Sequence, residues 1–291
     1  MASIPATLRI GHPTVKGDRG RGPHFPALGL RRCQAELTEP FSLNGPGRFA
    51  GRTCLVTGGG RGIGRAIAVA LGAEGAAVAV AARTADQCEA VAEEIGPGAL
   101  AIPADVSDAD ACKEAVATVE ERLGPLSVLV NAAGVSPVRS RAEKHDVDAF
   151  RAILDVNLTG AFLVTRAAAP SLFSTGGSVV NIASVAGVSA SPRIAGYGAS
   201  KAALIQLTRT LAREWADRGV RVNAVCPGYL ETELTADFLA VPHLREEVLA
   251  ATPLGRLATF EEVVAPTLFL ASDEASFVTG AALLVDGGMA A

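Results

Sequence analysis

The fold is constrained most by an alternation, from Arg52 onward, of short apolar runs with longer segments of helical period. Each gap between runs can hold a crossover helix, which parallel neighbouring strands require. Continuous apolar strands are typical of sheets covered on both faces. We therefore predict an α/β domain with a doubly wound parallel sheet of seven strands flanked by helices, at residues 53–57, 77–82, 100–104, 126–131, 179–184, 220–225 and 281–285.

The first 48 residues differ in composition from the rest of the chain. They contain seven Lys or Arg against three Asp or Glu, together with seven glycines and six prolines that interrupt helix and strand patterns. We expect a disordered N-terminal extension over 1–48, without the apolar stretch of a signal peptide, and one domain over 49–291. A translation start further downstream is an open alternative.

Charge and cysteine usage exclude several classes of function. Residues 49–291 hold 19 Lys or Arg against 27 Asp or Glu, a net charge of −8, so we expect no nucleic-acid partner. No apolar run approaches the roughly 18 residues of a membrane span. The five cysteines include no Cys-x-x-Cys pair, which predicts no disulfide framework, no metal site and a cytoplasmic location.

A glycine-rich turn follows the first predicted strand, with Gly58, Gly62 and Gly64 around Arg61 and Ile63. Such glycines let the backbone curl tightly and approach a pyrophosphate, while the next helix offers free N–H groups to the anion. The spacing is not the literal G-x-G-x-x-G, so a plain glycine-rich turn is the alternative. We predict that all five residues contact a dinucleotide.

The end of the second predicted strand indicates which dinucleotide is bound. NAD sites usually place Asp or Glu here, to bind the ribose hydroxyls. This chain has Ala82 followed by Arg83, and Arg61 lies in the glycine turn. Two guanidinium groups match the extra phosphate of NADP, so we predict that NADP(H) is preferred and NAD(H) is possible. Two ordinary surface arginines are the alternative.

Tyr197 and Lys201 are four residues apart in a predicted helix that runs to about Arg218. Their side chains therefore lie on one face. A nearby ammonium favours the phenolate, and bringing the phenol pKa from about 10 to near 7 would take about 4 kcal/mol. We predict that Lys201 lowers the pKa of Tyr197, which then transfers a proton to or from a substrate oxygen.

Together these segments resemble the short-chain dehydrogenase/reductase family, in its short single-domain branch, over residues 49–291. The resemblance implies a Rossmann-like sheet and a catalytic set of Asn157, Ser184, Tyr197 and Lys201. In the family the serine hydrogen-bonds the substrate oxygen, the tyrosine transfers the proton, the lysine also contacts the nicotinamide ribose, and the asparagine supports the lysine through a water relay.

The resemblance also implies further cofactor contacts. Asp105 and Val106 match the pair that meets adenine, and the segment containing Pro227, Gly228 and Thr232 matches the one that meets the nicotinamide amide. The family's Asn-Asn-Ala-Gly motif stands here as Asn-Ala-Ala-Gly. Contacts are expected from Tyr197 and Lys201 as well, and from three residues of this turn, Asn131, Ala133 and Gly134.

The expected activity is NADP(H)-dependent interconversion of a carbonyl and a secondary alcohol on a small molecule. The carboxyl half resembles both 3-oxoacyl carrier-protein reductases and gluconate-type dehydrogenases, and acidic residues in the substrate loop over 229–256 argue against carrier-protein docking. Arg139, Arg141 and Arg193 are either carboxylate ligands or solvated surface charges. A non-catalytic NADP-binding sensor is the alternative from another class. By resemblance, we expect a homotetramer.

Overall fold

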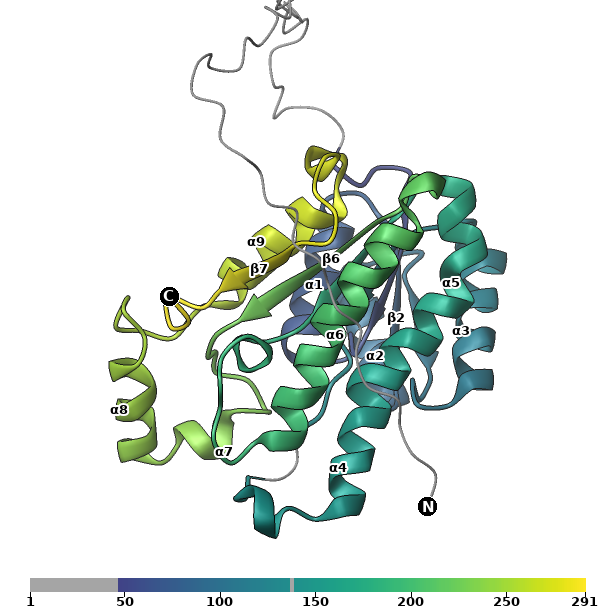
Figure 1. Cartoon of the computed structure of the whole chain (residues 1–291). Helices are drawn as coiled ribbons and strands as arrows, with labels where there is room; N and C mark the ends of the chain where they lie inside the picture. The colour runs from purple at the N-terminus through teal and green to yellow at the C-terminus, as the bar shows by residue number, and fades with distance from the viewer. Residues whose placement is uncertain (1–46, 137–138) are drawn as a thin grey trace, which may run out of the picture. The chain divides into compact units, whose positions relative to one another are not determined.

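The computed structural model describes residues 47–136 and 139–291 (Figure 1). The extension predicted over 1–48 lies outside the described residues, except for Gly47 and Arg48. The guanidinium of Arg48 donates to the Glu74 carboxylate at 2.6 Å, and the next residue, Phe49, is buried.

Seven parallel strands form one sheet in the order β3-β2-β1-β4-β5-β6-β7. The predicted α/β fold is confirmed, and every strand end agrees with the prediction to within two residues. The strand before Ser184 ends earlier because that hydroxyl leaves the sheet to accept a hydrogen bond from the Ala186 N–H. The strands are β1 (Thr53–Thr57), β2 (Ala77–Ala82), β3 (Leu100–Pro103), β4 (Leu126–Asn131), β5 (Ser178–Ile182), β6 (Arg221–Pro227) and β7 (Ala282–Val285).

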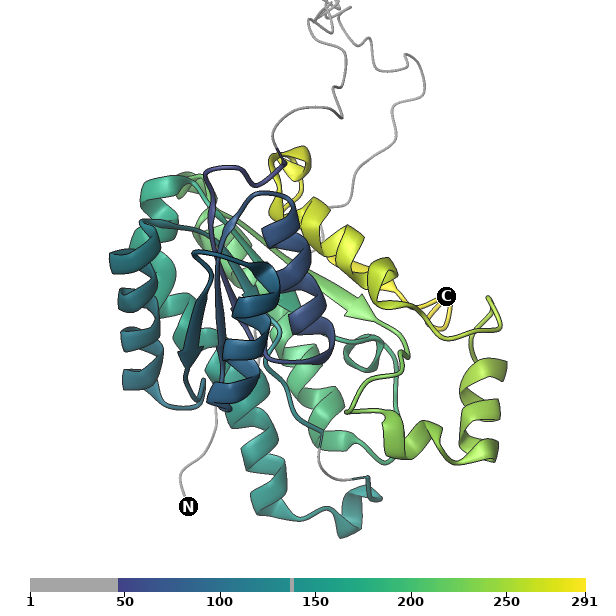
Figure 2. The same cartoon turned by 180° about the vertical axis from the view of Figure 1, so that it is seen from behind.

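Helices cover both faces of this sheet (Figures 1 and 2). One face carries α1 (Gly62–Ala73), α2 (Ala85–Ile95) and α9 (Phe260–Ala271). The other carries α3 (Ala109–Leu123), α5 (Ala161–Thr175) and α6 (Ala195–Glu214), and α4 (Val147–Leu154) packs against α6. Two shorter helices, α7 (Ala236–Leu239) and α8 (Pro242–Ala250), follow β6.

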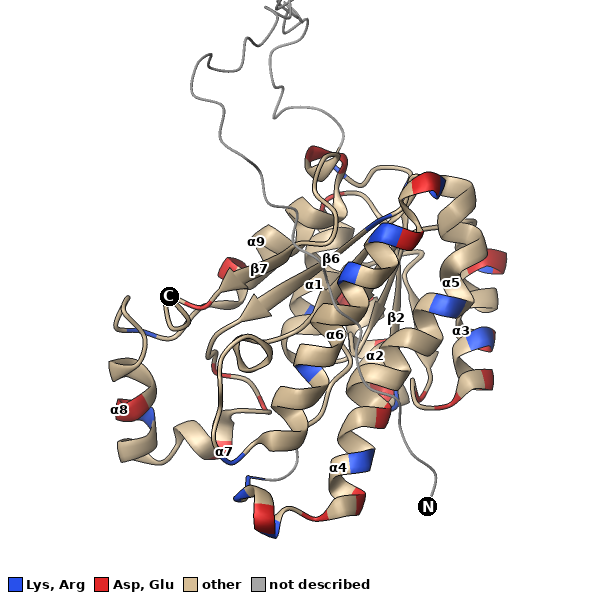
Figure 3. Ribbon diagram, in the orientation of Figure 1, with Lys and Arg blue, Asp and Glu red and all other residues tan. Residues whose placement is uncertain are grey.

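The strands are mainly apolar because successive side chains enter different helical layers. In β1, Val56 packs in the cluster that includes α1 and α9, whereas Leu55 packs with α3 and α5. Both side chains are fully buried. Figure 3 accordingly shows charged residues mainly on helices and loops, with the strands almost entirely tan. These two cores explain why the sequence shows continuous apolar runs rather than alternation.

The sheet order reverses beside β1, and this reversal positions the site. The chain moves outward from β1 through β2 to β3, then returns to pair β4 with the other edge of β1. After these two strands the chain therefore continues to opposite faces of the sheet, into α1 on one face and into α5 on the other. Open α/β sheets bind ligands in the crevice that this divergence creates.

A π-helical turn, Asp155–Gly160, joins α4 to α5 in one continuous helical rod. Such turns are rare and occur frequently at functional sites. This one contains Asn157, whose side chain is fully buried against the carboxyl edge of the sheet. A Cβ on Gly160 would stand 2.7 Å from Val106 Cγ2, so glycine allows the rod to pack closely against the loop that follows β3.

Candidate active site

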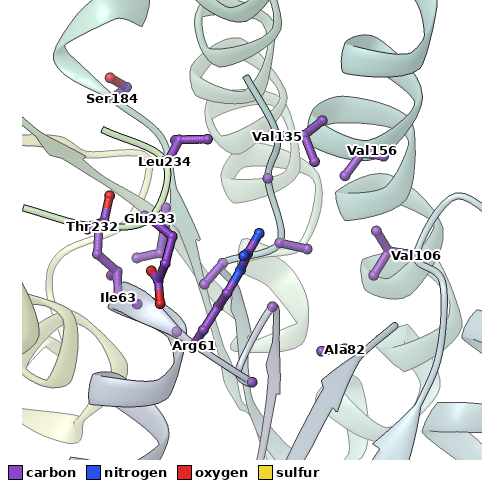
Figure 4. Close-up of a pocket in the computed structure, with 18 of the residues that line it drawn as sticks. Arg61, Ile63, Ala82, Val106, Val135, Val156, Ser184, Thr232, Glu233 and Leu234 are labelled. Atoms are coloured by element: carbon purple, nitrogen blue, oxygen red, sulfur yellow. The ribbon is translucent and has the colours of Figure 1, made fainter. Parts of the chain in front are cut away.

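One cleft of about 410 Å³ lies at the carboxyl edge of the sheet (Figure 4). Its walls come from the loops after β1 to β6 and from the start of α6. This volume is within the range usual for small-molecule sites. Of the predicted site residues, the cleft is lined by Gly58, Arg61, Gly62, Ile63, Gly64, Arg83, Asp105, Val106, Ala133, Gly134, Ser184, Tyr197, Lys201, Pro227, Gly228 and Thr232.

The glycine turn is a backbone cradle that excludes side chains. A Cβ on Gly64 would stand 2.2 Å from the Gly58 carbonyl oxygen, and one on Gly58 would stand 2.5 Å from the Ala133 nitrogen. Gly58 also has a φ of +65°, which favours glycine. The turn therefore brings the backbone of the β1 loop against that of the β4 loop and leaves the first N–H groups of α1 facing the cleft.

Two side chains of opposite charge lie at the start of α1. Arg61 extends into the cleft, and the Glu233 carboxylate lies next to it in Figure 4. One oxygen of Glu233 is 3.4 Å from the position of a Cβ on Gly62, the first residue of α1. An anion at a helix N-terminus is stabilised by the free N–H groups and the helix dipole. Glu233 thus stands where a phosphate would be expected.

One end of the cleft brings together residues predicted to meet the extra phosphate and the adenine. Arg83 follows β2, and the loop after β3 supplies Asp105 and Val106. Hydrogen bonds from the backbone N–H and hydroxyl of Ser107 hold the pKa of Asp105 below its usual range, and the Arg83 cation lowers it further. The Asp105 carboxylate is therefore charged at neutral pH.

Tyr197, Ser184 and Lys201 meet at the other end of the cleft. A hydrogen bond from the Ser184 hydroxyl favours the phenolate of Tyr197. Lys201 Nζ lies 5.7 Å from the centre of the Tyr197 ring and donates to the Ile182 carbonyl at 2.7 Å. The predicted convergence of these three side chains on one site is present in the structure.

The direction of the Tyr197 pKa differs from the prediction. Burial raises the pKa of the phenol, the Ser184 hydroxyl partly opposes this, and the Tyr229 phenol raises the pKa further. Burial also lowers the pKa of Lys201 to about 8, with Cys226 opposing. The buried ammonium of Lys201 therefore lowers the stability of the fold, and it is only partly protonated above neutral pH.

Asn157 lies behind the cleft rather than on its wall. Its oxygen accepts from the Val135 N–H at 2.8 Å, and its amide donates to the Val135 carbonyl and the Ser200 hydroxyl, each at 3.0 Å. These bonds fasten the loop after β4 to α6 beside Lys201. A water relay from Asn157 to the lysine remains a prediction.

Asn131 also lies beneath the cleft. Its amide donates to Thr165 Oγ1 at 2.9 Å and to Asn181 Oδ1 at 2.8 Å, and only 3 % of the residue is exposed. The structure therefore assigns it to holding β4 against β5 and α5. Ala133 and Gly134 of the same turn do line the cleft.

Several lining residues were not anticipated from the sequence. Val135, Val156, Leu234 and Thr235 complete the wall, and Glu233 had been placed only among the acidic residues of the substrate loop. No spacing rule singles these residues out, because their position depends on how the loops after β4 and β6 fold over the sheet. An acidic residue directly after Thr232 was the only available signal.

The geometry fits a dinucleotide along the whole cleft. The glycine cradle and α1 N-terminus suit a pyrophosphate, Arg61 and Arg83 suit a further phosphate, and the hydroxyls of Ser184 and Tyr197 suit a reacting oxygen. Among residues 47–136 and 139–291, no group of three or more His, Cys, Asp or Glu is placed to hold a metal ion. Within the same residues, no helix is long and apolar enough to cross a membrane.

Comparison with known proteins decides the family. A family model described as enoyl-(acyl carrier protein) reductase matches residues 58–290. The chain belongs to the short-chain dehydrogenase/reductase family. It is 44 % identical over 210 residues to galactitol 2-dehydrogenase (L-tagatose-forming) of Cereibacter sphaeroides, covering 71 % of this chain and 82 % of the relative.

Two further relatives represent different substrate classes within this family. The 3-oxoacyl-(acyl-carrier-protein) reductase of Thermotoga maritima is 43 % identical over 188 residues, covering 64 % of this chain and 74 % of the relative. The structure of a gluconate 5-dehydrogenase from Burkholderia cenocepacia, in complex with NADP and tartrate, superposes with a TM-score of 0.80 at 35 % identity. The match covers 83 % of this chain and 96 % of that one. The chain is thus similar to dehydrogenases and reductases that act on CH–OH groups.

Removing the Glu233 charge should tighten dinucleotide binding. Glu233→Gln is expected to lower the Kd for NADPH about fivefold, or ~1 kcal/mol, because the carboxylate competes with phosphate for the α1 N-terminus. Fluorescence titration measures this, and the gain should shrink at high salt. Glu246→Gln, the same change on exposed α8, is the control. An unchanged Kd in Glu233→Gln would contradict this reading of the loop.

Lys201 should cost stability in a pH-dependent way. Its folded-state pKa of about 8 lies below the ordinary 10.5, so the buried ammonium destabilises the fold fully below pH 8 and not at all above about pH 10.5. Lys201→Met should therefore abolish turnover yet raise the unfolding free energy at pH 7, by on the order of 1–3 kcal/mol. Denaturation at several pH values should show that gain fading between pH 8 and 10.5.

The exposed Lys144→Met provides the matched control for this titration, with no pH-dependent gain expected. A Lys201→Met gain that stayed constant over the same pH range would show that the ammonium is not the destabilising group.

Proposed function

We propose that this chain is an NADP(H)-dependent oxidoreductase that interconverts a carbonyl and a secondary alcohol on a small molecule. The observation that carries the proposal is the single cleft that holds the glycine cradle at one end and the Ser184–Tyr197–Lys201 group at the other. A binding protein needs the cradle alone. The second group has a use only where a proton is transferred next to the cofactor.

The residues of the cleft divide the reaction between them. When bound, the nicotinamide supplies the hydride in reduction and accepts it in oxidation. Ser184 holds the substrate oxygen, and Tyr197, hydrogen-bonded to Ser184, donates its proton to that oxygen in reduction and takes it back in oxidation. Lys201 lies close enough to stabilise the phenolate that remains and to bind the nicotinamide ribose.

NADP preference rests on the two arginines at the phosphate end. Arg61 and Arg83 both line the cleft, and the strand end before Arg83 carries Ala82 in place of an acidic residue. A carboxylate there would repel a 2′-phosphate, whereas a guanidinium pairs with it. Relatives with bound NADP, such as the gluconate 5-dehydrogenase, support the same choice.

For the substrate, we favour a small polyol or sugar acid over a carrier-bound thioester. Glu231, Glu233 and Asp237 are exposed beside the mouth, and Glu246 and Glu247 are exposed on α8. An acidic mouth repels an acidic carrier protein. The similarity to galactitol and gluconate dehydrogenases supports this candidate, while the Thermotoga maritima relative keeps 3-oxoacyl carrier-protein reduction as the second.

We also propose a homotetramer, as the resemblance implies. The edge strand β7 leaves Leu283 and Leu284 partly exposed, and Phe277 just before it is fully exposed. Phe162 is exposed at the start of α5, on the other helical layer. Two separate apolar surfaces suit two kinds of contact between subunits, and light scattering that reports a monomer would exclude the assembly.

The cofactor assignment predicts a difference between NADPH and NADH. NADPH should bind at least about tenfold more tightly, or ~1.4 kcal/mol, and Arg83→Ala should remove most of that difference. Fluorescence titration of both cofactors measures it, with the exposed Arg122→Ala in α3 as control. Equal binding of NADH by the wild-type protein would show that NAD is the cofactor and favour the sugar-acid dehydrogenase.

Tyr197→Phe separates an enzyme from a non-catalytic sensor. Loss of the hydroxyl should lower turnover of a carbonyl panel by about two orders of magnitude or more, since proton transfer to the oxygen has no other donor of this kind in the cleft. Binding of NADPH should persist within a few fold. A wild-type protein that binds NADPH but turns over no carbonyl or alcohol would support the sensor.

A further inference from the structure

Three side chains from separate segments stack beside the mouth of the cleft. Tyr229 follows β6, Phe238 lies on α7, and Arg139 belongs to the loop after β4. The Tyr229 and Phe238 rings are stacked with centroids 5.9 Å apart, and the Arg139 guanidinium lies 3.7 Å from the Phe238 centroid. A guanidinium held flat on a ring keeps its N–H edge available for other partners.

The stack begins next to the catalytic tyrosine. Tyr229 directly follows Gly228, which lines the cleft, and its phenol is close enough to raise the pKa of Tyr197. Arg139 stands at the far end of the stack. A continuous chain of contacts, from Arg139 through Phe238 to Tyr229, thus leads to the residues of the catalytic end.

The loop that carries Arg139 is fastened to the segment before α6. The Ser140 N–H donates to the Arg193 carbonyl at 2.9 Å, and its hydroxyl lies 3.1 Å from His145 Nδ1. His145 Nε2 in turn lies 3.4 Å from the position of a Cβ on Gly196, the residue before Tyr197. The position of Arg139 is therefore coupled to that of the catalytic helix.

The charge of Arg139 is not used within the described part of the chain. No ion pair among residues 47–136 and 139–291 includes it, whereas neighbouring Arg141 has Glu143 at 3.7 Å and Arg245, on α8, has Glu231 at 2.5 Å. Arg139 is also exposed. An oriented cation without a carboxylate partner, beside an otherwise acidic mouth, is suited to an anionic group on the ligand.

We propose that Arg139 binds the carboxylate of the substrate, so that the enzyme acts on a hydroxy acid or its keto acid rather than on a neutral polyol. Phe238, which contacts the guanidinium, and Tyr229, which stacks on Phe238, are positioning residues. The inference rests on the proposed oxidoreductase function and adds the chemical class of its substrate.

The test compares hydroxy acids of four to six carbons with their amides, which match them in shape and lack the charge. With the wild-type protein and NADP, kcat/KM should be at least about tenfold higher for an acid than for its amide. In Arg139→Gln that ratio should fall to near one through a higher KM for the acid, while the amide's kcat/KM stays unchanged. Arg139→Lys should restore part of the preference.

Arg141→Gln is the matched control, since it removes the same charge two residues away, and should leave the ratio unchanged. Calorimetric titration of the NADP-loaded protein with each acid and amide gives the same comparison without turnover. An acid preference that is missing in the wild type, or that survives in Arg139→Gln, would overturn the proposal. An equal loss of kcat/KM for acid and amide in Arg139→Gln would also overturn it, because it would show that Arg139 only supports the structure of the loop.

Failure of the underlying function has a different signature. In that case the wild-type protein would turn over no acid and no amide of the panel. Turnover of neutral substrates with no acid preference would leave the oxidoreductase intact and remove only the anion subsite.

Discussion

The close approach of two backbone loops at Gly58 is the constraint on which the rest of the site depends. A Cβ on Gly58 would collide with the backbone of Ala133, so the loops after β1 and β4 can meet only if Gly58 has no side chain. Gly64 must lack one too, because its Cβ would collide with the Gly58 carbonyl within the same turn. The contact of the two loops sets the entry of α1 and directs its N-terminus into the cleft. It also places the β4 loop where Asn157 can bind Val135. The contact between these two loops thus positions both the proposed phosphate site and the catalytic residues.

The catalytic end is held by buried polar groups at a cost to stability. Asn157 and Lys201 are 0 % and 4 % exposed, and each donates a hydrogen bond to a backbone carbonyl near the carboxyl edge of the sheet. Burial opposes the charge of Lys201 and the phenolate of Tyr197 alike. Such opposition is expected where residues are selected for chemistry rather than for the fold. The π-helical turn around Asn157 is a further departure from regular structure at the same place.

Much of this arrangement was predictable because it depends on local patterns. Strand-length apolar runs located all seven strands. The spacing of Tyr197 and Lys201, together with the Ser184 that the family resemblance implies, predicted three groups that do meet. The remainder depends on contacts between distant segments. The raised pKa of Tyr197 follows from the burial of its phenol, and the bond from Lys201 to Ile182 follows from the depth of α6 against β5. Asn131 lies beneath the cleft for a similar reason, and the stack of Arg139 on Phe238 needs two loops with no shared periodicity.

The central claim is that one cleft carries hydride transfer with Tyr197 as the proton donor. The most direct measurement uses NADPH deuterated at the transferring position, a panel of small keto acids and ketones, and mass spectrometry of the alcohol formed. The account predicts one deuterium on the new carbinol carbon for each NADPH consumed, and none in Tyr197→Phe over the same time. Alcohol formed without deuterium, or labelled product undiminished in Tyr197→Phe, would contradict it.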